Sequence, residues 1–223
     1  MTKQKIFEKI QEQIHQEIYP GASLALYQAG QWQEFYFGLA DPQERKVTQA
    51  GLVYDLASVS KVVGVGTIVA FLYEQGKLDL DLPLQHYYPT FHREDVTVRQ
   101  LLTHTSGLDP FIPNRDQLTA PELKEALNHL TVLEDKTFRY TDVNFLLLGF
   151  MLEEIYGQAL DKIFQDQIFQ LWGLAETGFG PVSGAVPTVR GIKDGQVNDP
   201  KARVLGVHAG SAGLFSTLKD LEI

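Results

Sequence analysis

The first twenty residues alternate between apolar and polar positions with the period of a helix. Ile6, Phe7, Ile10, Ile14 and Ile18 recur every three or four residues. This spacing places the apolar side chains on one face of a helix. The segment contains no continuous apolar run and no small-residue cleavage site, so it predicts an amphipathic helix and no export signal.

Two apolar and aromatic stretches follow this helix. Residues 22–28 read ASLALYQ and residues 32–37 read WQEFYF, with an Ala-Gly pair between them. Short stretches of this composition around a glycine-containing turn are typical of two strands in a hairpin. We therefore expect a β-hairpin over residues 22–37.

The middle of the chain has the pattern of a block of helices. Residues 58–75 are apolar nearly all round and stop at Gly76, which predicts a helix buried in a core. Thr97 is a suitable N-cap for a short helix through His104, closed by Gly107. Further helices are predicted over residues 121–130, 142–156 and 161–172.

The order of elements predicts a mixed α/β (α+β) fold. Glycine, proline and small residues dominate residues 178–213, where we expect loops with a short strand or two. The chain thus divides into a helix and hairpin (1–55), a helical lobe (56–176) and a return segment (177–223). Two strands do not form a stable sheet alone, so either the return segment completes the sheet or the chain lacks its end.

Composition excludes several classes of function. The 223 residues contain 28 acidic and 19 basic side chains, for a net charge of −9, which disfavours nucleic acid and anionic membranes as partners. The chain has no cysteine, which excludes disulfides, thiolate nucleophiles and cysteine-based metal sites. The longest apolar run, Val62–Tyr73, is twelve residues, too short to span a bilayer. We expect a cytoplasmic protein without a membrane span.

Ser58 and Lys61 form the first candidate for chemistry. They are three residues apart at the start of the predicted buried helix, so both project from one face. A serine hydroxyl needs a base within hydrogen-bond reach. A desolvated lysine near the positive end of a helix dipole favours its neutral form and can accept that proton.

This spacing has a structural alternative. Ser58 could be a helix N-cap and Lys61 a surface lysine, and Ser216 and Lys219 repeat the pattern without an apolar helix around them. We interpret the second pair as coincidence. The apolar neighbours of Lys61 favour the functional interpretation, because a lysine in so hydrophobic a helix is rarely solvated.

Tyr140 and Asp142 stand just before another strongly apolar helix. Asp142 is placed to cap that helix, and Tyr140 projects from its end. A phenol near a lysine ammonium ionises more easily and can relay protons to Ser58, although a packed tyrosine before a capped helix is the commoner case. The six histidines lack ligand spacing, and we expect His104 to be a structural hydrogen-bonding group.

Four segments resemble the serine β-lactamase and DD-peptidase family, which includes class C β-lactamases, penicillin-binding proteins and related esterases. The resemblance runs from about Pro20 to the end, and the segments occur in the family's order. They are Asp55–Lys61 (DLASVSK), Val98–Leu108 (VRQLLTHTSGL), Tyr140–Gly149 (YTDVNFLLLG) and Ala212–Asp220 (AGLFSTLKD), the last resembling a loop and helix.

The resemblance implies a β-lactamase/transpeptidase-like fold, with a helical lobe packed on an antiparallel sheet lobe. It implies a serine hydrolase that forms an acyl-enzyme with an amide, ester or β-lactam carbonyl of a small-molecule or peptide substrate. Ser58 would be the nucleophile, with Lys61 and Tyr140 sharing the proton transfers. No metal or organic cofactor is implied.

The sequence departs from the family's pattern in two places. Asp142 replaces the usual asparagine, and a carboxylate accepts from a substrate amide but cannot donate, which favours ester or peptide substrates over β-lactams. The K-T-G or H-x-G strand is not found in its expected context. His208-Ala209-Gly210 matches H-x-G by letter but precedes the AGLFST stretch, so we do not assign it this role.

Without that strand the oxyanion would have one hydrogen-bond donor instead of two, at a cost of roughly 10²–10³ in rate. We therefore expect a sheet lobe that is incomplete, a weak or inactive enzyme, and an open sheet edge through which copies could associate. The alternative is a truncated or degenerate relative that binds cell-wall-peptide-like ligands without turnover.

Overall fold

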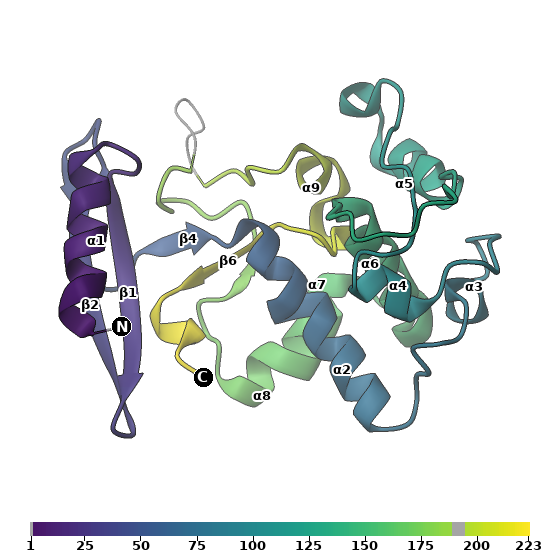
Figure 1. Cartoon of the computed structure of the whole chain (residues 1–223), viewed down its shortest axis with the longest axis horizontal. Helices are drawn as coiled ribbons and strands as arrows, with labels where there is room; N and C mark the ends of the chain where they lie inside the picture. The colour runs from purple at the N-terminus through teal and green to yellow at the C-terminus, as the bar shows by residue number, and fades with distance from the viewer. Residues whose placement is uncertain (1, 189–194) are drawn as a thin grey trace.

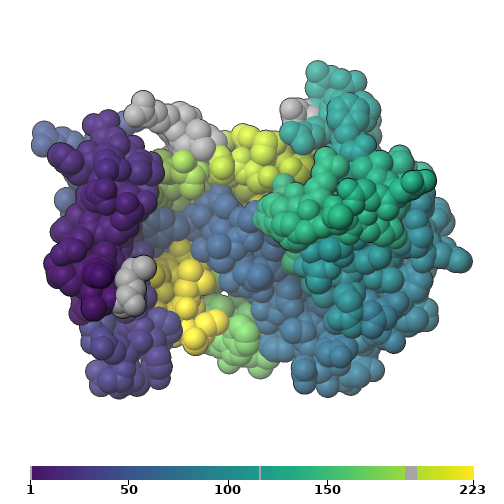
Figure 2. Space-filling model, in the orientation of Figure 1, coloured from purple at the N-terminus to yellow at the C-terminus, as the bar shows by residue number. Residues whose placement is uncertain are grey.

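The computed structural model describes residues 2–188 and 195–223. A helix and a hairpin lie at one end of the molecule, and most of the helices lie at the other (Figure 1). A second small sheet lies between them. In the space-filling view the N-terminal layer, in purple, stands apart from the helical block, with the C-terminal residues, in yellow, between them (Figure 2).

The predicted hairpin is confirmed. β1 (Gly21–Gln28) pairs antiparallel with β2 (Gln31–Asp41), with Gln28 opposite Gln31. The two loop residues, Ala29 and Gly30, both have positive φ angles of 51° and 81°. A two-residue turn of this kind matches the right-handed twist of the strands it joins. The sheet gains a third strand that the sequence did not predict, β3 (Lys46–Val47), beside β2.

The predicted N-terminal helix is also confirmed, as α1 (Lys3–His15). Its Phe7 ring lies 4.6 Å from that of Phe35 and 5.3 Å from that of Phe37, both on β2. None of the residues of α1 is fully buried. The apolar stripe of the helix therefore covers one face of the hairpin and forms a thin layer rather than a deep core.

One interpretation of the sequence was that the return segment completes the sheet of the hairpin. The structure shows that it does not. β6 (Leu214–Thr217) instead pairs with β4 (Val53–Asp55) on one side and β5 (Gly178–Phe179) on the other. The sequence resemblance had placed a loop and helix over residues 212–220. All four side chains of β6 are buried, because this central strand is covered on both faces.

The predicted helix at Ser58 is a continuous helical segment with irregular geometry. A 3₁₀ turn (Ala57–Val59) leads into a π-helix (Lys61–Gly66) and then into α2 (Thr67–Glu74). It is not buried all round as expected, since Val59 and Val62 are 49% and 61% exposed. Single-turn π segments often occur at functional sites.

The same helical segment has the composition of a membrane span. Its eighteen residues have a mean hydropathy of 1.3, and 39% of them are buried inside the protein. This is weak evidence for a span, because a core helix passes the same test. Val65, Ile68 and Val69 are almost completely buried among the other helices, which is what a core helix requires.

The helix α6 (Asp142–Tyr156) has the bounds that the sequence predicted. Its residues from Val143 to Leu152 are all buried, and it ends at Gly157 in the left-handed conformation. A helix that is apolar all round belongs in the middle of a core. α6 accordingly contacts α4 (Val98–Leu102) and α5 (Ala120–Asn128).

The shorter helices were predicted with less accurate ends. Thr97 forms the expected cap, as a capping box with Gln100, but α4 ends at Leu102 and not at His104. His104 has φ 56°, which an α-helix does not allow. The remaining helical elements in this part of the chain are α3 (Leu84–Tyr87), the 3₁₀ turn Arg115–Gln117, α7 (Leu160–Phe164), the π-helix Gln165–Phe169 and α8 (Gln170–Trp172).

The segment expected to be mostly loop contains an additional helix. α9 (Pro200–Leu205) and a 3₁₀ turn (Gly206–His208) precede β6, and a 3₁₀ turn (Lys219–Leu221) follows it. Asp199 caps α9 by accepting from the N–H of Ala202 at 2.8 Å. An aspartate before a proline is a helix start signal, so the beginning of α9 is marked in the sequence although we did not predict this helix.

A glycine pair brings the segment before β6 against α6. The Cα of Gly149 would lie 3.1 Å from a Cβ built on Gly210, and that Cβ would also clash with the carbonyl oxygen of Phe145. Neither backbone can give way, so only glycine permits this close approach. The contact fixes the position of Ser211, the next residue.

We predict that Gly210→Ala lowers the free energy of unfolding by about 1–3 kcal/mol, because the added methyl group meets rigid backbone. Gly178→Ala is the matched control, since a Cβ there meets nothing within 4 Å. It should change stability by less than about 0.5 kcal/mol. Urea denaturation followed by circular dichroism measures both, and equal effects would contradict the assigned contact.

Candidate active site

Ser58 stands at the start of the long helix, after a strained turn. Ala57 has φ 46°, in the left-handed region that residues with a side chain rarely adopt. Asp55 holds this turn: one carboxylate oxygen accepts from the N–H of Ala57 and the other from that of Asn198, both at 2.8 Å. The turn presents Ser58 at the surface as an exposed side chain.

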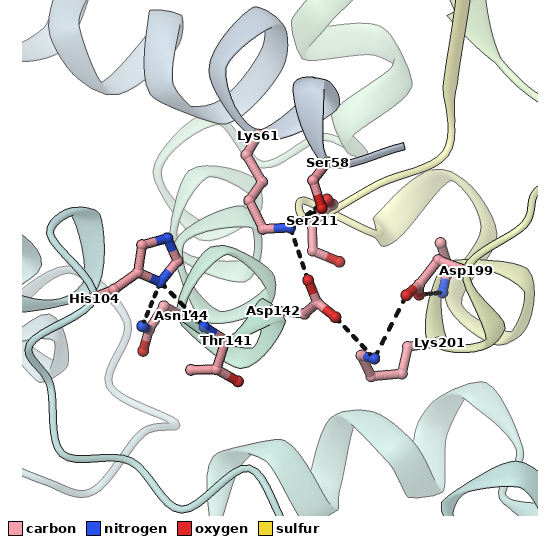
Figure 3. Close-up of polar contacts among 10 residues, drawn as sticks. Ser58, Lys61, His104, Thr141, Asp142, Asn144, Asp199, Lys201 and Ser211 are labelled. Carbon is pink, nitrogen blue, oxygen red and sulfur yellow. Dashed lines mark hydrogen bonds and ion pairs between the residues drawn. The ribbon is translucent and has the colours of Figure 1, made fainter. Parts of the chain in front are cut away.

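Lys61 is buried beside Ser58 and makes three polar contacts. Its side chain is only 4% exposed. Its Nζ donates to Ser58 Oγ at 2.8 Å, to Asp142 Oδ1 at 2.7 Å and to the carbonyl oxygen of Ser211 at 2.9 Å (Figure 3). Three acceptors match the three N–H groups of an ammonium. The structure thus brings together the serine and lysine that their spacing had suggested.

Asp142 does not cap α6, so that sequence prediction is wrong. Thr141 is the N-cap residue, and Asp142 is the first residue of the helix. Its carboxylate lies between two lysines, with Oδ1 on Lys61 and Oδ2 on Lys201 at 3.0 Å. A lysine ammonium is a stronger partner for a carboxylate than a backbone N–H group is.

Burial and charge act in opposite directions on Asp142. Burial by itself raises the pKa of the carboxyl, but the hydrogen bonds and charges of Lys61 and then Lys201 outweigh it. The net result is a pKa of Asp142 below its ordinary value. Asp142 is therefore ionised at neutral pH.

Tyr140 lies beside this cluster with its ring facing Lys61. The ring centroid is 5.1 Å from Lys61 Nζ and 4.6 Å from the ring of His104. At 5.1 Å the ammonium is within the range of a cation–π interaction. Tyr140 is 54% exposed, so its side chain is open to solvent.

His104 contacts residues at the N-terminal end of α6, next to Asp142. Its Nδ1 lies 3.0 Å from the Asn144 side-chain nitrogen and accepts from the N–H of Thr141 at 3.4 Å. Asn144 Oδ1 in turn accepts from Ser106 at 2.7 Å. Burial, followed by the charge of Lys61, lowers the pKa of His104. Nδ1 thus faces two donors at the start of α6, which is the structural hydrogen-bonding role that we expected of His104.

The two other motifs in the sequence do not form a second site. Ser216 is fully buried and bonded to Thr177 Oγ1 at 2.8 Å, whereas Lys219 bonds to Glu222 at 2.9 Å. His208 contacts Glu153, eleven residues along α6 from Asp142 and so about 16 Å away by helical rise. Among the described residues no three His, Asp or Glu side chains gather to hold a metal ion.

Sequence reasoning missed several residues that complete the site. Ser60 Oγ accepts from the N–H of Leu214 at 3.1 Å and so joins the helix to β6. Ser211 supplies the third acceptor for Lys61, and Lys201 the second cation for Asp142. The start signal of α9 could have revealed that helix. No local pattern indicates that Lys201 faces a residue 59 positions away in the sequence.

A buried lysine beside a surface serine is the arrangement that the sequence resemblance had implied, and the carboxylate of Asp142 stands where the resemblance implied an asparagine. The beta-lactamase family model matches residues 6–223. The chain belongs to the beta-lactamase family. The match covers the helical block and both sheets, including every residue of the cluster around Lys61.

Curated relatives from bacteria are similar over most of this chain. A protein named "Putative D-alanyl-D-alanine carboxypeptidase" from Escherichia coli strain K12 is 28% identical, over 78% of this chain and 50% of its own length. A beta-lactamase from Providencia stuartii is 32% identical, over 73% of this chain and 44% of its own length. The chain spans about half the length of these relatives.

Solved structures of other beta-lactamase-like proteins have the same fold. A hydrolase with promiscuous acyltransferase activity superposes with a TM-score of 0.78 at 22% identity, over 98% of this chain and 70% of that one. A class C beta lactamase from Rhodobacter sphaeroides gives 0.74 at 22% identity, over 96% and 62%. A D-amino acid amidase from Ochrobactrum anthropi SV3 gives 0.74 at 21% identity, over 99% and 69%.

The ion pairs of Asp142 predict a pH-dependent contribution to stability. A carboxyl whose pKa is lowered by folding stabilises the protein above its unfolded pKa of about 4, and this stabilisation is lost as pH falls through the folded pKa. Asp142→Asn should therefore be less stable than the parent at neutral pH, and the difference should shrink below about pH 4. Urea denaturation at a series of pH values measures it. A difference independent of pH would contradict the paired carboxylate.

Proposed function

We propose that this chain is a serine hydrolase that acts through an acyl-enzyme on Ser58, with an amide, ester or β-lactam carbonyl as its substrate. One observation carries the proposal: the hydroxyl of Ser58 is at the surface, and 2.8 Å from it lies a buried lysine nitrogen. A serine becomes a useful nucleophile when a base within hydrogen-bond reach takes its proton. Lys61 is that base.

The contacts of Lys61 suit both of its protonation states. As an ammonium it donates to Ser58, Asp142 and Ser211. As a neutral amine it has two N–H groups and one lone pair. The two N–H groups then serve Asp142 and the Ser211 carbonyl, and the lone pair receives the hydroxyl hydrogen of Ser58. Lys61 can therefore gain and lose a proton without leaving its place.

The reaction follows from this exchange. Ser58 Oγ forms a bond to the substrate carbonyl carbon as its proton passes to Lys61. The leaving group departs with a proton returned by Lys61, and water then releases the acyl group by the reverse sequence. Ser58 lies at the N-terminal end of its helical segment, where the positive end of the helix dipole favours the negative charge that develops on the carbonyl oxygen.

Tyr140 is the second proton-transfer group in this proposal. Its ring lies against Lys61, and its exposure leaves it open to a leaving group bound over Ser58. Tyr140 thus complements Lys61 on the side of the site that faces the substrate.

Asp142 can bind substrates that present an N–H group, because its carboxylate accepts hydrogen bonds. Its two oxygens contact lysines, and a carboxylate has about four lone-pair positions, so acceptor capacity remains for a substrate amide. It cannot donate to a substrate carbonyl. The similar proteins include ones named as a carboxypeptidase, a beta-lactamase and an amidase, which supports a carbonyl substrate of this general class.

We predict that a fluorescent phosphonate or penicillin labels the protein at Ser58, because that hydroxyl alone combines exposure with a lysine contact in the part of the chain described. Peptide mapping by mass spectrometry locates the adduct. Ser58→Ala should abolish labelling, whereas Ser183→Ala, at another exposed serine, should leave it unchanged.

Two results would overturn the assignment: an adduct on Ser216, or undiminished labelling of Ser58→Ala. A protein that binds a penicillin reversibly but forms no adduct would favour the alternative of a relative that binds ligands without turnover. Equilibrium binding of the same probe, measured before and after denaturation, separates these cases. Only a covalent adduct survives denaturation.

A further inference from the structure

Lys201 enters the site from α9, across Asp142 from Lys61 (Figure 3). Its side chain is 12% exposed, and its Nζ lies 3.0 Å from Asp142 Oδ2 and 3.5 Å from Asp199 Oδ2. A lysine so far removed from solvent needs anionic partners. Here one of these partners is the carboxylate that also binds Lys61.

The position of Lys201 is fixed relative to Ser58. Asp199 both contacts Lys201 and caps α9 through Ala202. The preceding residue, Asn198, donates to the same Asp55 carboxylate that holds the N–H of Ala57, next to Ser58. One carboxylate thus ties the start of α9 to the turn that presents Ser58. Such support on rigid elements is what a preorganised site requires.

The charges of this cluster alternate and balance. Lys61 and Lys201 carry two positive charges, and Asp142 and Asp199 carry two negative ones. A carboxylate paired with one lysine alone holds that lysine firmly as an ammonium. A second lysine on the other oxygen partly neutralises the carboxylate's charge, so the carboxylate stabilises the ammonium form of the first lysine less strongly. Lys61 must become neutral before it can take the proton of Ser58.

We propose that Lys201 is a positioning residue for acyl transfer, which holds Asp142 between two lysines and thereby allows Lys61 to accept the proton of Ser58. This inference rests on the proposed function. In the step itself the Ser58 O–H bond breaks and the Oγ–acyl bond forms as the proton moves to Lys61, and the bond from the acyl carbon to its leaving group breaks as Lys61 returns that proton to the leaving group. Lys201 and Asp142 exchange no proton. The other titratable groups that face the pair are Asp199, His104 and Tyr140, which the test leaves unchanged.

The first test is the pH dependence of Ser58 acylation by an activated nitrophenyl ester. Lys201→Met should shift the rising limb of the rate profile to higher pH by about one unit, which is a roughly tenfold loss on that limb. Lys201→Arg keeps the positive charge and should keep the parental midpoint. Lys162→Met removes a lysine whose side chain is 71% exposed and is the matched control.

The double variant tests whether Lys201 acts through Asp142. With an amide at position 142 there is no carboxylate charge to share. Lys201→Met should therefore shift the profile of Asp142→Asn by much less than it shifts the parent. Such non-additivity is expected of residues in one network, and equal shifts in both backgrounds would overturn the proposal.

A second measurement does not depend on activity. Carbon-13 NMR of labelled aspartate follows the titration of Asp142, identified by the signal that Asp142→Asn lacks. Lys201→Met should raise the midpoint of this titration, because the hydrogen bond and charge of Lys201 help to lower the pKa of Asp142. Lys162→Met should leave it in place.

The two measurements separate the inference from the function on which it rests. An unchanged Asp142 midpoint in Lys201→Met overturns the inference, and so does a raised midpoint with an unshifted rate profile. If the parent forms no acyl-enzyme, the proposed function fails, and the titration alone decides whether Lys201 controls Asp142. Circular dichroism verifies that each variant is folded.

Discussion

The structure depends on the burial of one ammonium group, that of Lys61, inside an apolar core. An unpaired charge there costs several kcal/mol, so the chain must bring acceptors to it. It does so from three places: Ser58 on the same helix, Asp142 81 residues away in sequence and the Ser211 carbonyl 150 residues away. These contacts fix where α6 begins and where the segment before β6 lies. Stability and the proposed chemistry therefore require the same arrangement.

The remaining features of the fold hold these three acceptors in place. The glycine contact between Gly149 and Gly210 allows the Ser211 carbonyl to reach the lysine. Asp55 and Ser60 fasten the turn at Ser58 to α9 and to β6. His104 and Asn144 hold the N-terminal end of α6. Each of these groups joins segments distant in sequence, so the cluster is rigid although its members lie on short elements.

Sequence alone predicted the elements whose signals are local. The apolar period of α1, the apolar run of α6, the N-cap at Thr97 and the Ala-Gly turn each depend on neighbouring residues, and all four are confirmed. The Ser58–Lys61 contact was predictable for the same reason. By contrast, β6 and α9 are short, and their positions depend on distant partners. The cap assigned to Asp142 was wrong because a long-range ion pair is stronger than a local hydrogen bond.

The proposed acyl transfer requires that Lys61 remove the proton of Ser58, and the acylation rate of Lys61→Ala tests this requirement most directly. Burst kinetics with a nitrophenyl ester measure the rate constant for modification of Ser58, and circular dichroism reports folding. This variant has no ammonium left to bury at position 61, and Asp142 keeps Lys201 as its partner, so the fold should persist. The account predicts a folded protein whose acylation is slower by roughly 10²–10⁴-fold. A folded variant that acylates at the parental rate would contradict it.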